Sequence, residues 1–206
     1  GERQSLELSD GSTVELNANS QMTYEPEWSD DSDREIWLQG EAFFEVKKKP
    51  KTQQKLRVFT DDLMVEVLGT TFNVNSNGGK TSVYLEEGQI RLYLNEIDST
   101  VLMNPGDLIV YSEQTRKVTR KSQESTDLYT SWKNGVLKFK ATSLREVLQK
   151  IEHTYGIEFK LTNEADYSRE IDFPLPIDEL ETTIFILDRT ISDLEIRKEG
   201  DRYVVE

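Results

Sequence analysis

Apolar and polar residues alternate with a period of two through most of the first 120 residues of the chain. Leu6 and Leu8 alternate with polar neighbours, and the same alternation resumes after residue 12. The dipeptide Asp10-Gly11 lies between the two runs, and its glycine accepts the positive φ that a tight hairpin turn requires. The pattern therefore predicts two antiparallel strands that are joined by a turn at residues 9–12.

The longest alternating segment covers residues 36–46. One of its faces carries apolar residues and Gly40, and the other carries glutamate, glutamine and two aromatic residues, so we expect a long, half-buried strand that is kinked at Gly40. Shorter apolar runs follow, with turn sequences rich in Gly and Asn between them, at residues 56–59, 63–68, 72–74, 83–85, 90–94, 101–103 and 108–111. Many short strands without an intervening helical period predict an all-β roll or sandwich.

The pattern changes after residue 121. Residues 122–127 are polar and have no period, which predicts a linker. A short apolar run at 136–139 then predicts a strand. Ser143 and Glu146 have the spacing of a capping box, and apolar residues recur at helical spacing behind them, so we expect a helix that ends near Gly156.

The remaining residues predict further strands and a second helix that is capped by Asp178. The expected strands lie at residues 157–161, 170–173, 194–197 and 203–205. The order β-α-β-β-α-β-β in this short segment predicts a small α/β sandwich. We therefore expect an α+β protein with an all-β domain at residues 1–121, a linker at 122–127 and a small α/β domain at 128–206.

The composition narrows the range of partners. The chain has 39 acidic and 25 basic residues and a formal net charge of −14. Nucleic acids and anionic membrane surfaces attract clusters of Lys and Arg, and the basic run at 47–51 is interrupted by Pro50 and predicts a loop. We therefore expect no nucleic-acid partner, and the charge favours a basic or neutral one.

The chain contains no cysteine, which excludes disulfides, thiolate zinc sites and thiol catalysis. No apolar run approaches the roughly 18 residues of a membrane helix, and we find no signal peptide. Because the chain begins with Gly1 rather than Met, we expect a piece of a longer protein whose membrane anchor helix lies outside it.

Few residue patterns indicate catalysis. His153 is the single histidine and lies near the expected end of a helix, where a structural role is expected. Glu41 and Glu45 share one strand face about 13 Å apart, which exceeds the roughly 5–9.5 Å between glycosidase carboxylates, so we expect both to be solvated. The acidic run at 29–33 lacks the spacing and the glycine of a calcium loop. We expect no enzyme, no metal and no cofactor.

A carbohydrate-binding module is the alternative function. Trp28, Trp37 and Trp132 could form a platform on which sugar rings stack, and Trp37 and Phe43 lie on the face opposite the expected core. A second packed layer of the roll would explain the position of these two residues equally well. The sequence leaves this alternative open.

The first half of the chain resembles the extracytoplasmic domain of FecR-family anti-sigma regulators. The resemblance rests on motifs in the family's order, namely DGS at 10–12, VELNANS at 14–20, LQGEAFFEV at 38–46, VLGTTFNV at 67–74, LEEG at 85–88 and NPGD at 104–107. It departs from the family at 53–57, where QQKLR replaces the usual Pro-Phe. The second half resembles the family's C-terminal domain, which is similar to the secretin and TonB short N-terminal domain, through WKNGVLKF at 132–139, LREVL at 144–148 and YGI at 155–157.

The resemblance implies a periplasmic sensor that is anchored in the inner membrane through a helix outside this sequence. Its expected partners are the N-terminal signalling domain of a TonB-dependent outer-membrane transporter and, through a cytoplasmic part of the protein, an extracytoplasmic-function sigma factor. Glycans or iron chelates are the implied cargo of the transporter. Edge strands pair with other chains through free backbone groups. We therefore expect the partner to contact the closing hairpin at Leu194, Ile196, Tyr203 and Val205, or the apolar face of the first helix.

Overall fold

The computed structural model describes residues 2–29, 31–95, 99–112, 114–162, 167–200 and 202–206. Within these ranges the chain forms two compact units, one of which ends at Thr126 while the other extends from Asp127 to Glu206. We call them the β unit and the α/β unit. The described helices include none that is both long and apolar enough to cross a membrane.

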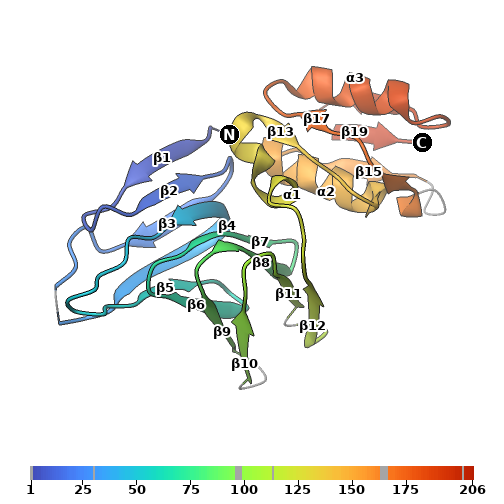
Figure 1. The fold of residues 1–206 in the computed structure, drawn as a ribbon. Helices are drawn as coiled ribbons and strands as arrows, with labels where there is room; N and C mark the ends of the chain where they lie inside the picture. The colour runs from blue at the N-terminus through green and yellow to red at the C-terminus, as the bar shows by residue number, and fades with distance from the viewer. Residues whose placement is uncertain (1, 30, 96–98, 113, 163–166, 201) are drawn as a thin grey trace. The chain divides into compact units, whose positions relative to one another are not determined.

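The β unit consists of short strands that are joined mainly by tight turns. The twelve strands found in the described part of this unit are β1 Gln4–Glu7, β2 Thr13–Leu16, β3 Gln21–Tyr24, β4 Arg34–Glu45, β5 Leu56–Phe59, β6 Leu63–Val67, β7 Thr71–Asn77, β8 Lys80–Glu87, β9 Ile90–Leu94, β10 Ser99–Met103, β11 Leu108–Ser112 and β12 Lys117–Lys121. They form one curled sheet in the order β10-β9-β6-β5-β4-β7-β8-β11-β12, in which β2 and β3 also pair with β4 and β1 pairs with β2 (Figure 1). The expected all-β unit is confirmed.

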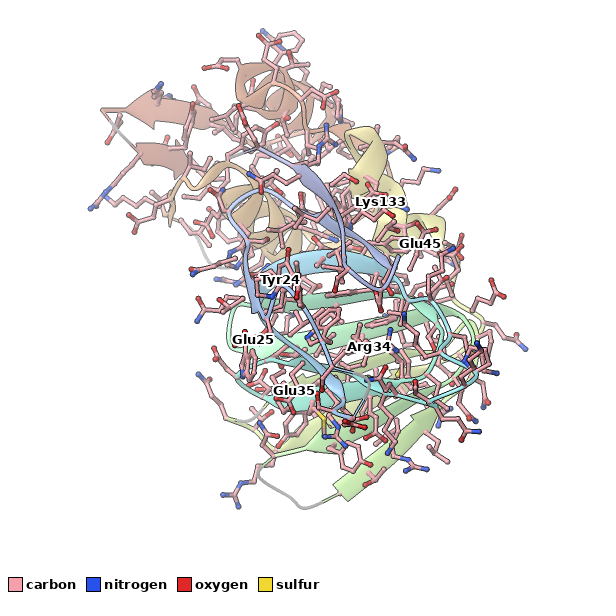
Figure 2. All side chains as sticks on the ribbon, turned by 90° about the vertical axis from the view of Figure 1, so that its left-hand side faces the viewer. Tyr24, Glu25, Arg34, Glu35, Glu45 and Lys133 are labelled. Atoms are coloured by element: carbon pink, nitrogen blue, oxygen red, sulfur yellow. The ribbon has the colours of Figure 1, made fainter. Side chains whose placement is uncertain are left out.

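The long strand β4 joins the two halves of this sheet because it changes partners at Gly40. Before Gly40 it pairs with β3 and, in parallel, with β5, and from Gly40 onward it pairs with β2 and β7. Gly40 has a φ of +94°, and a Cβ atom there would lie 2.3 Å from Oγ of Ser20. Figure 2 labels Arg34 at the start of β4 and Glu45 at its end. The predicted kink at Gly40 is confirmed, and only glycine fits it.

Alternate residues of both halves of the sheet face one hydrophobic core. The core side chains include Ile36 and Leu38 from the first part of β4, and Ala42 and Phe44 from the second part. The rings of Phe44 and Phe72 stack in this core with centroids 5.0 Å apart. The period-two pattern predicted this inner face correctly because the strands that form the core are apolar on alternate residues.

The described part of the α/β unit contains three α-helices, a 3-10 turn and several short strands. Its elements are α1 Asp127–Thr130, a 3-10 turn Ser131–Asn134, β13 Val136–Leu137, β14 Thr142–Ser143, α2 Leu144–Tyr155, β15 Phe159–Leu161, β16 Glu170–Ile171, β17 Leu175–Pro176, α3 Leu180–Thr190, β18 Ile196–Glu199 and β19 Arg202–Val205. Strand β19 lies in the middle of a sheet with the order β15-β19-β18, while β13 pairs with β17 and β14 with β16. The expected α+β class is confirmed.

The sequence predicted both ends of α2 correctly and the N-cap of α3 incorrectly. Ser143 caps α2 by accepting a hydrogen bond from the backbone N–H of Glu146 at 3.3 Å, and Gly156 ends the helix in a left-handed conformation, as expected. The predicted cap of α3 is wrong. Its N-cap residue is Glu179, with no side-chain cap, and not Asp178. A Cβ atom on Gly135 would lie 2.6 Å from the Asp178 carboxylate, so this carboxylate packs against the turn before β13.

Candidate functional site

The closing hairpin of the α/β unit was the expected partner site, and its side chains differ in exposure. Tyr203 and Val205 lie on β19, the middle strand, and are buried in the core of the unit, whereas Leu194 and Ile196 are half-buried. The apolar face of α2, the other candidate, is also buried, as Leu144 at its start shows. The accessible feature of the hairpin is therefore the backbone edge of β18.

Hydrogen bonding fixes which backbone groups of β18 point outward. Glu195 and Glu206 exchange two backbone hydrogen bonds of 3.0 and 2.9 Å. Because such pairs alternate with non-bonded pairs in an antiparallel ladder, the backbone groups of Ile196 and Lys198 point away from β19. The N–H of Ile196 donates to Oδ1 of Asp188 at 3.0 Å. The N–H and C=O of Lys198 thus lie on an edge where no described strand pairs with β18.

A buried polar cluster brings three of the sequence motifs of the β unit together. Glu41 is 4% exposed and accepts hydrogen bonds of 2.9 Å from Nδ2 of Asn17 and from Nδ2 of Asn73. The expectation that Glu41 is solvated is therefore wrong, whereas Glu45 is exposed and accepts a hydrogen bond from the Thr13 hydroxyl. The two amides compensate the desolvation of the carboxylate, so this cluster connects β2, β4 and β7 and has no free group for chemistry.

A second buried group fastens the start of β4. The guanidinium of Arg34 forms an ion pair with Asp10 and donates to backbone carbonyls of Lys47 and Gln54. Burial raises the pKa of Asp10, but hydrogen bonds from the Ser12 backbone and from Arg34 outweigh it, so the pKa lies below its ordinary value of 3.8. These contacts join the first hairpin turn to the loop after β4, and they are structural.

A third ionic cluster lies on the outer face of the sheet, opposite the core. Glu66 is nearly buried and forms ion pairs with Lys55 at 3.0 Å, Arg57 at 3.2 Å and Arg91 at 3.8 Å. Burial raises the pKa of Glu66, but the hydrogen bonds from Lys55 and Arg57 lower it by more than burial raises it, so the carboxyl pKa lies below 4.5. A cleft of about 320 Å³ opens beside this cluster. The sequence did not predict it, because these residues come from separate strands.

The three tryptophans do not form one exposed platform. Trp132 is buried in the α/β unit, and Trp28 packs partly buried against the core of the β unit. Trp37 is 47% exposed and stacks on Phe59 with ring centroids 5.4 Å apart, whereas Phe43 on the same side of β4 is buried. Only Trp37 of the proposed platform therefore remains available to a ligand.

The described residues show few features of a catalytic or metal site. No group of three or more His, Asp and Glu side chains in the described part of the chain could hold a metal ion. In the acidic run at 29–33, Asp33 accepts a hydrogen bond from the Lys55 backbone and pairs with Arg57, and residue 30 lies outside the described ranges. His153 is exposed in the last turn of α2.

The sequence pattern did not predict the edge strand β12. All residues of β12 are exposed, and Lys117, Arg120 and Lys121 make it basic in a strongly acidic chain. Arg120 pairs with Asp107, and Ser122 donates to the same carboxylate at 2.6 Å. The alternation of apolar residues, which marks the other strands, is missing here because neither face of β12 is buried.

Comparison with known proteins gives a consistent assignment. The family model described as FecR protein matches residues 1–91, and the model described as FecR, C-terminal, matches residues 136–205. Two crystal structures of a "putative anti-sigma factor" from Parabacteroides distasonis, at 1.65 and 2.50 Å resolution, are each 27% identical to the chain. They superpose with TM-scores of 0.86 and 0.84 over 100% of this chain and 95% and 94% of theirs. No curated protein matches the chain. The two matched models and the fold show that this chain belongs to the FecR family.

Proposed function

We propose that this chain is the periplasmic sensor region of an anti-sigma factor that is anchored in the inner membrane. It receives a signal by contact with the N-terminal signalling domain of a TonB-dependent outer-membrane transporter. A cytoplasmic part of the same protein then controls an extracytoplasmic-function sigma factor. The membership in the FecR family and the anti-sigma description of the similar crystal structures support this assignment.

The observation that supports this contact is the unpaired backbone edge of β18 in the described sheet β15-β19-β18. A β-strand of the transporter domain can extend the sheet β15-β19-β18 by pairing with the outward N–H and C=O of Lys198. Among the predicted contact residues, Leu194 and Ile196 are half-buried beside this edge and can add apolar contacts. Tyr203 and Val205 act indirectly, because they hold the hairpin in the core of the unit.

The proposed mechanism is a protein contact without catalysis. The buried carboxylates Glu41, Asp10 and Glu66 are all engaged by side-chain donors of the fold. Their polar atoms stabilise the β unit and are not presented to a substrate. Signal transfer therefore depends on binding, and the cargo of the transporter need not touch this chain.

A reporter gene under the sigma factor's promoter tests this proposal in cells that carry the full-length protein. Lys198→Pro removes the outward N–H while the bonds of Arg197 and Glu199 to β19 remain, and proline is tolerated on edge strands. Lys198→Ala is the matched control, since it removes the charge and keeps the N–H. We expect transporter-dependent transcription to change in the Pro variant only. A response in the Pro variant equal to wild type would contradict pairing at β18.

A further inference from the structure

An aromatic row crosses the outer face of the β unit. Trp37 on β4 lies opposite Phe59 on β5, Phe59 lies opposite Met64 on β6, and Met64 lies opposite Tyr93 on β9. These four residues alternate with core residues along their strands, and each is exposed or half-buried. The aromatic row therefore forms an apolar strip on the solvent side of the sheet, where a folded protein gains nothing from it for its own core.

A charged row lies next to the aromatic row on the same face of the sheet, two residues away along each strand. Glu35, Arg57, Glu66, Arg91 and Leu102 follow one another across β4, β5, β6, β9 and β10. Arg57 lies among three carboxylates, 2.9 Å from Asp33, 3.2 Å from Glu66 and 3.9 Å from Glu35. These ion pairs fix the direction of the long side chains, so the face is ordered before any partner arrives.

The cleft beside Glu66 is positively charged, in contrast to the chain as a whole. Three cations, Lys48, Lys55 and Arg91, line it together with the single carboxylate of Glu66, so its net charge is +2 within a chain of net charge −14. The lining also includes two exposed leucines, Leu68 at 43% and Leu102 at 52% exposure. The cleft thus combines apolar walls with an excess of cations.

Two motif glycines build one wall of the cleft. A Cβ atom on Gly69 would lie 2.7 Å from Cβ of Lys48, and one on Gly88 would lie 2.9 Å from the backbone oxygen of Gly69. Gly88 also has a φ of +96°. The close approach of three backbone segments, further held by the Thr70 hydroxyl donating to the Gln89 carbonyl, therefore requires glycine at both positions.

We propose that this outer face docks a partner protein, which places an extended acidic segment with apolar side chains in the cleft between Leu68 and Leu102. Trp, Tyr, Met and Arg, which form the adjoining rows, are the residue types enriched at protein interfaces and their energetic centres. The cationic excess selects carboxylates on the partner. The aromatic row lies outside the cleft lining, on the far side of Glu66 and Arg91, and this wider face suits a protein surface better than a small anion. This site lies in the β unit and is independent of the proposed contact at β18.

Fluorescence anisotropy of the 206-residue chain with a labelled, capped heptapeptide of alternating Glu and Leu tests the proposal. We expect saturable binding, and no binding of the same peptide with Lys in place of Glu. The double variant Lys48→Glu and Arg91→Glu reverses two exposed cations, so binding should weaken by roughly tenfold or more. The double variant Lys117→Glu and Lys121→Glu is the matched control, because it makes the same charge change on the exposed strand β12.

Several outcomes would overturn the proposal. These are the absence of saturable binding of the Glu-Leu peptide, and an equal loss of affinity in the control that reverses Lys117 and Lys121. Leu102→Ser provides an independent check that changes no charge, and it should weaken binding in a chain whose circular dichroism is unchanged. Binding of an oligosaccharide that is lost in Trp37→Ala, in a chain that does not bind the peptide, would assign the face to sugars instead.

Discussion

Arg34 and Asp10 form a buried ion pair between the first turn of the β unit and the start of its longest strand, with side chains 1% and 4% exposed. The two residues are 24 positions apart in the sequence. The remaining N–H groups of Arg34 donate to backbone carbonyls of the loop that follows β4. A single side chain therefore links three segments, two of which are also joined by the hydrogen bond from the Lys47 N–H to the Ser12 hydroxyl oxygen.

Arg34→Met should destabilise the β unit by about 3–5 kcal/mol, because it leaves the buried carboxylate of Asp10 without its partner. The free energy of unfolding in urea, followed through the amide NMR signals of β4, measures the effect on this unit alone. Arg91→Met is the control, since Arg91 is 49% exposed and lies 3.8 Å from Glu66, which keeps its shorter pairs with Lys55 and Arg57, and it should cost less than about 1 kcal/mol. Equal costs for the two variants would refute the assignment of Arg34.

The stability of the β unit should fall in acid. Asp10, Glu66 and Asp107 all have pKa values lowered in the folded state. A lowered carboxyl pKa contributes stability that is fully present above the unfolded value, 3.8 for Asp and 4.5 for Glu, and is lost as the pH falls through the folded pKa. The urea midpoint should therefore change little from neutral pH to about pH 5 and then decrease towards pH 3.

Asp10→Asn provides the internal comparison for this pH dependence. The variant should be less stable at neutral pH, and it should lose less stability than wild type between about pH 5 and pH 3, because one titrating pair is gone. Urea midpoints of both proteins over this range give the two slopes. Parallel slopes would mean that the pair with Arg34 does not contribute.

Gly40→Ala should destabilise the β unit more than Gly11→Ala. Both glycines have positive φ, +94° and +80°, and this strain costs about 1–2 kcal/mol for a residue with a Cβ. At Gly11 the nearest atom to the new Cβ is Cγ of Lys47 at 4.0 Å, so only the strain acts. At Gly40 the Cβ also collides with Ser20. Urea unfolding of the two variants separates the collision from the strain, and similar losses would argue against the tight approach of Ser20.

Replacement of Glu41 tests the buried polar cluster. Glu41→Leu removes the acceptor of the Asn17 and Asn73 amides, and each buried amide left without it costs about 1–3 kcal/mol. Glu41→Gln keeps one carbonyl oxygen and should lose about half as much. Thermal unfolding of the two variants gives the order, and a Leu variant as stable as wild type would show that the amides do not depend on Glu41.

Local signals explain which parts of the fold could be predicted. The hairpin at Asp10-Gly11, the kink at Gly40 and the capped helix α2 each depend on residues within a few positions of one another, and each is confirmed. Strand β12 was missed because all of its residues are exposed. Strand β3 was missed because it is short and its apolar residues, Met22 and Tyr24, are only half-buried. A period-two pattern arises only where one face of a strand is buried.

The candidate sites depend on contacts that the sequence does not display. Glu41 was expected in solvent because its own strand alternates regularly, but its partners Asn17 and Asn73 lie 24 and 32 residues away. The burial of Tyr203 follows from the position of β19 between β15 and β18, and only the pairing of strands distant in the sequence determines that position. The cleft beside Glu66 is lined by residues of β6, β9 and β10 and of the loops that follow β4, β6 and β8, so no local segment of the sequence displays it.

Calorimetric titration of the 206-residue chain with the N-terminal signalling domain of the transporter encoded beside it tests the central claim most directly. The account predicts saturable binding at one site, retained in Lys198→Ala and abolished in Lys198→Pro. Absence of any heat of binding, with a correctly folded chain and signalling domain, would contradict the sensor function that we propose.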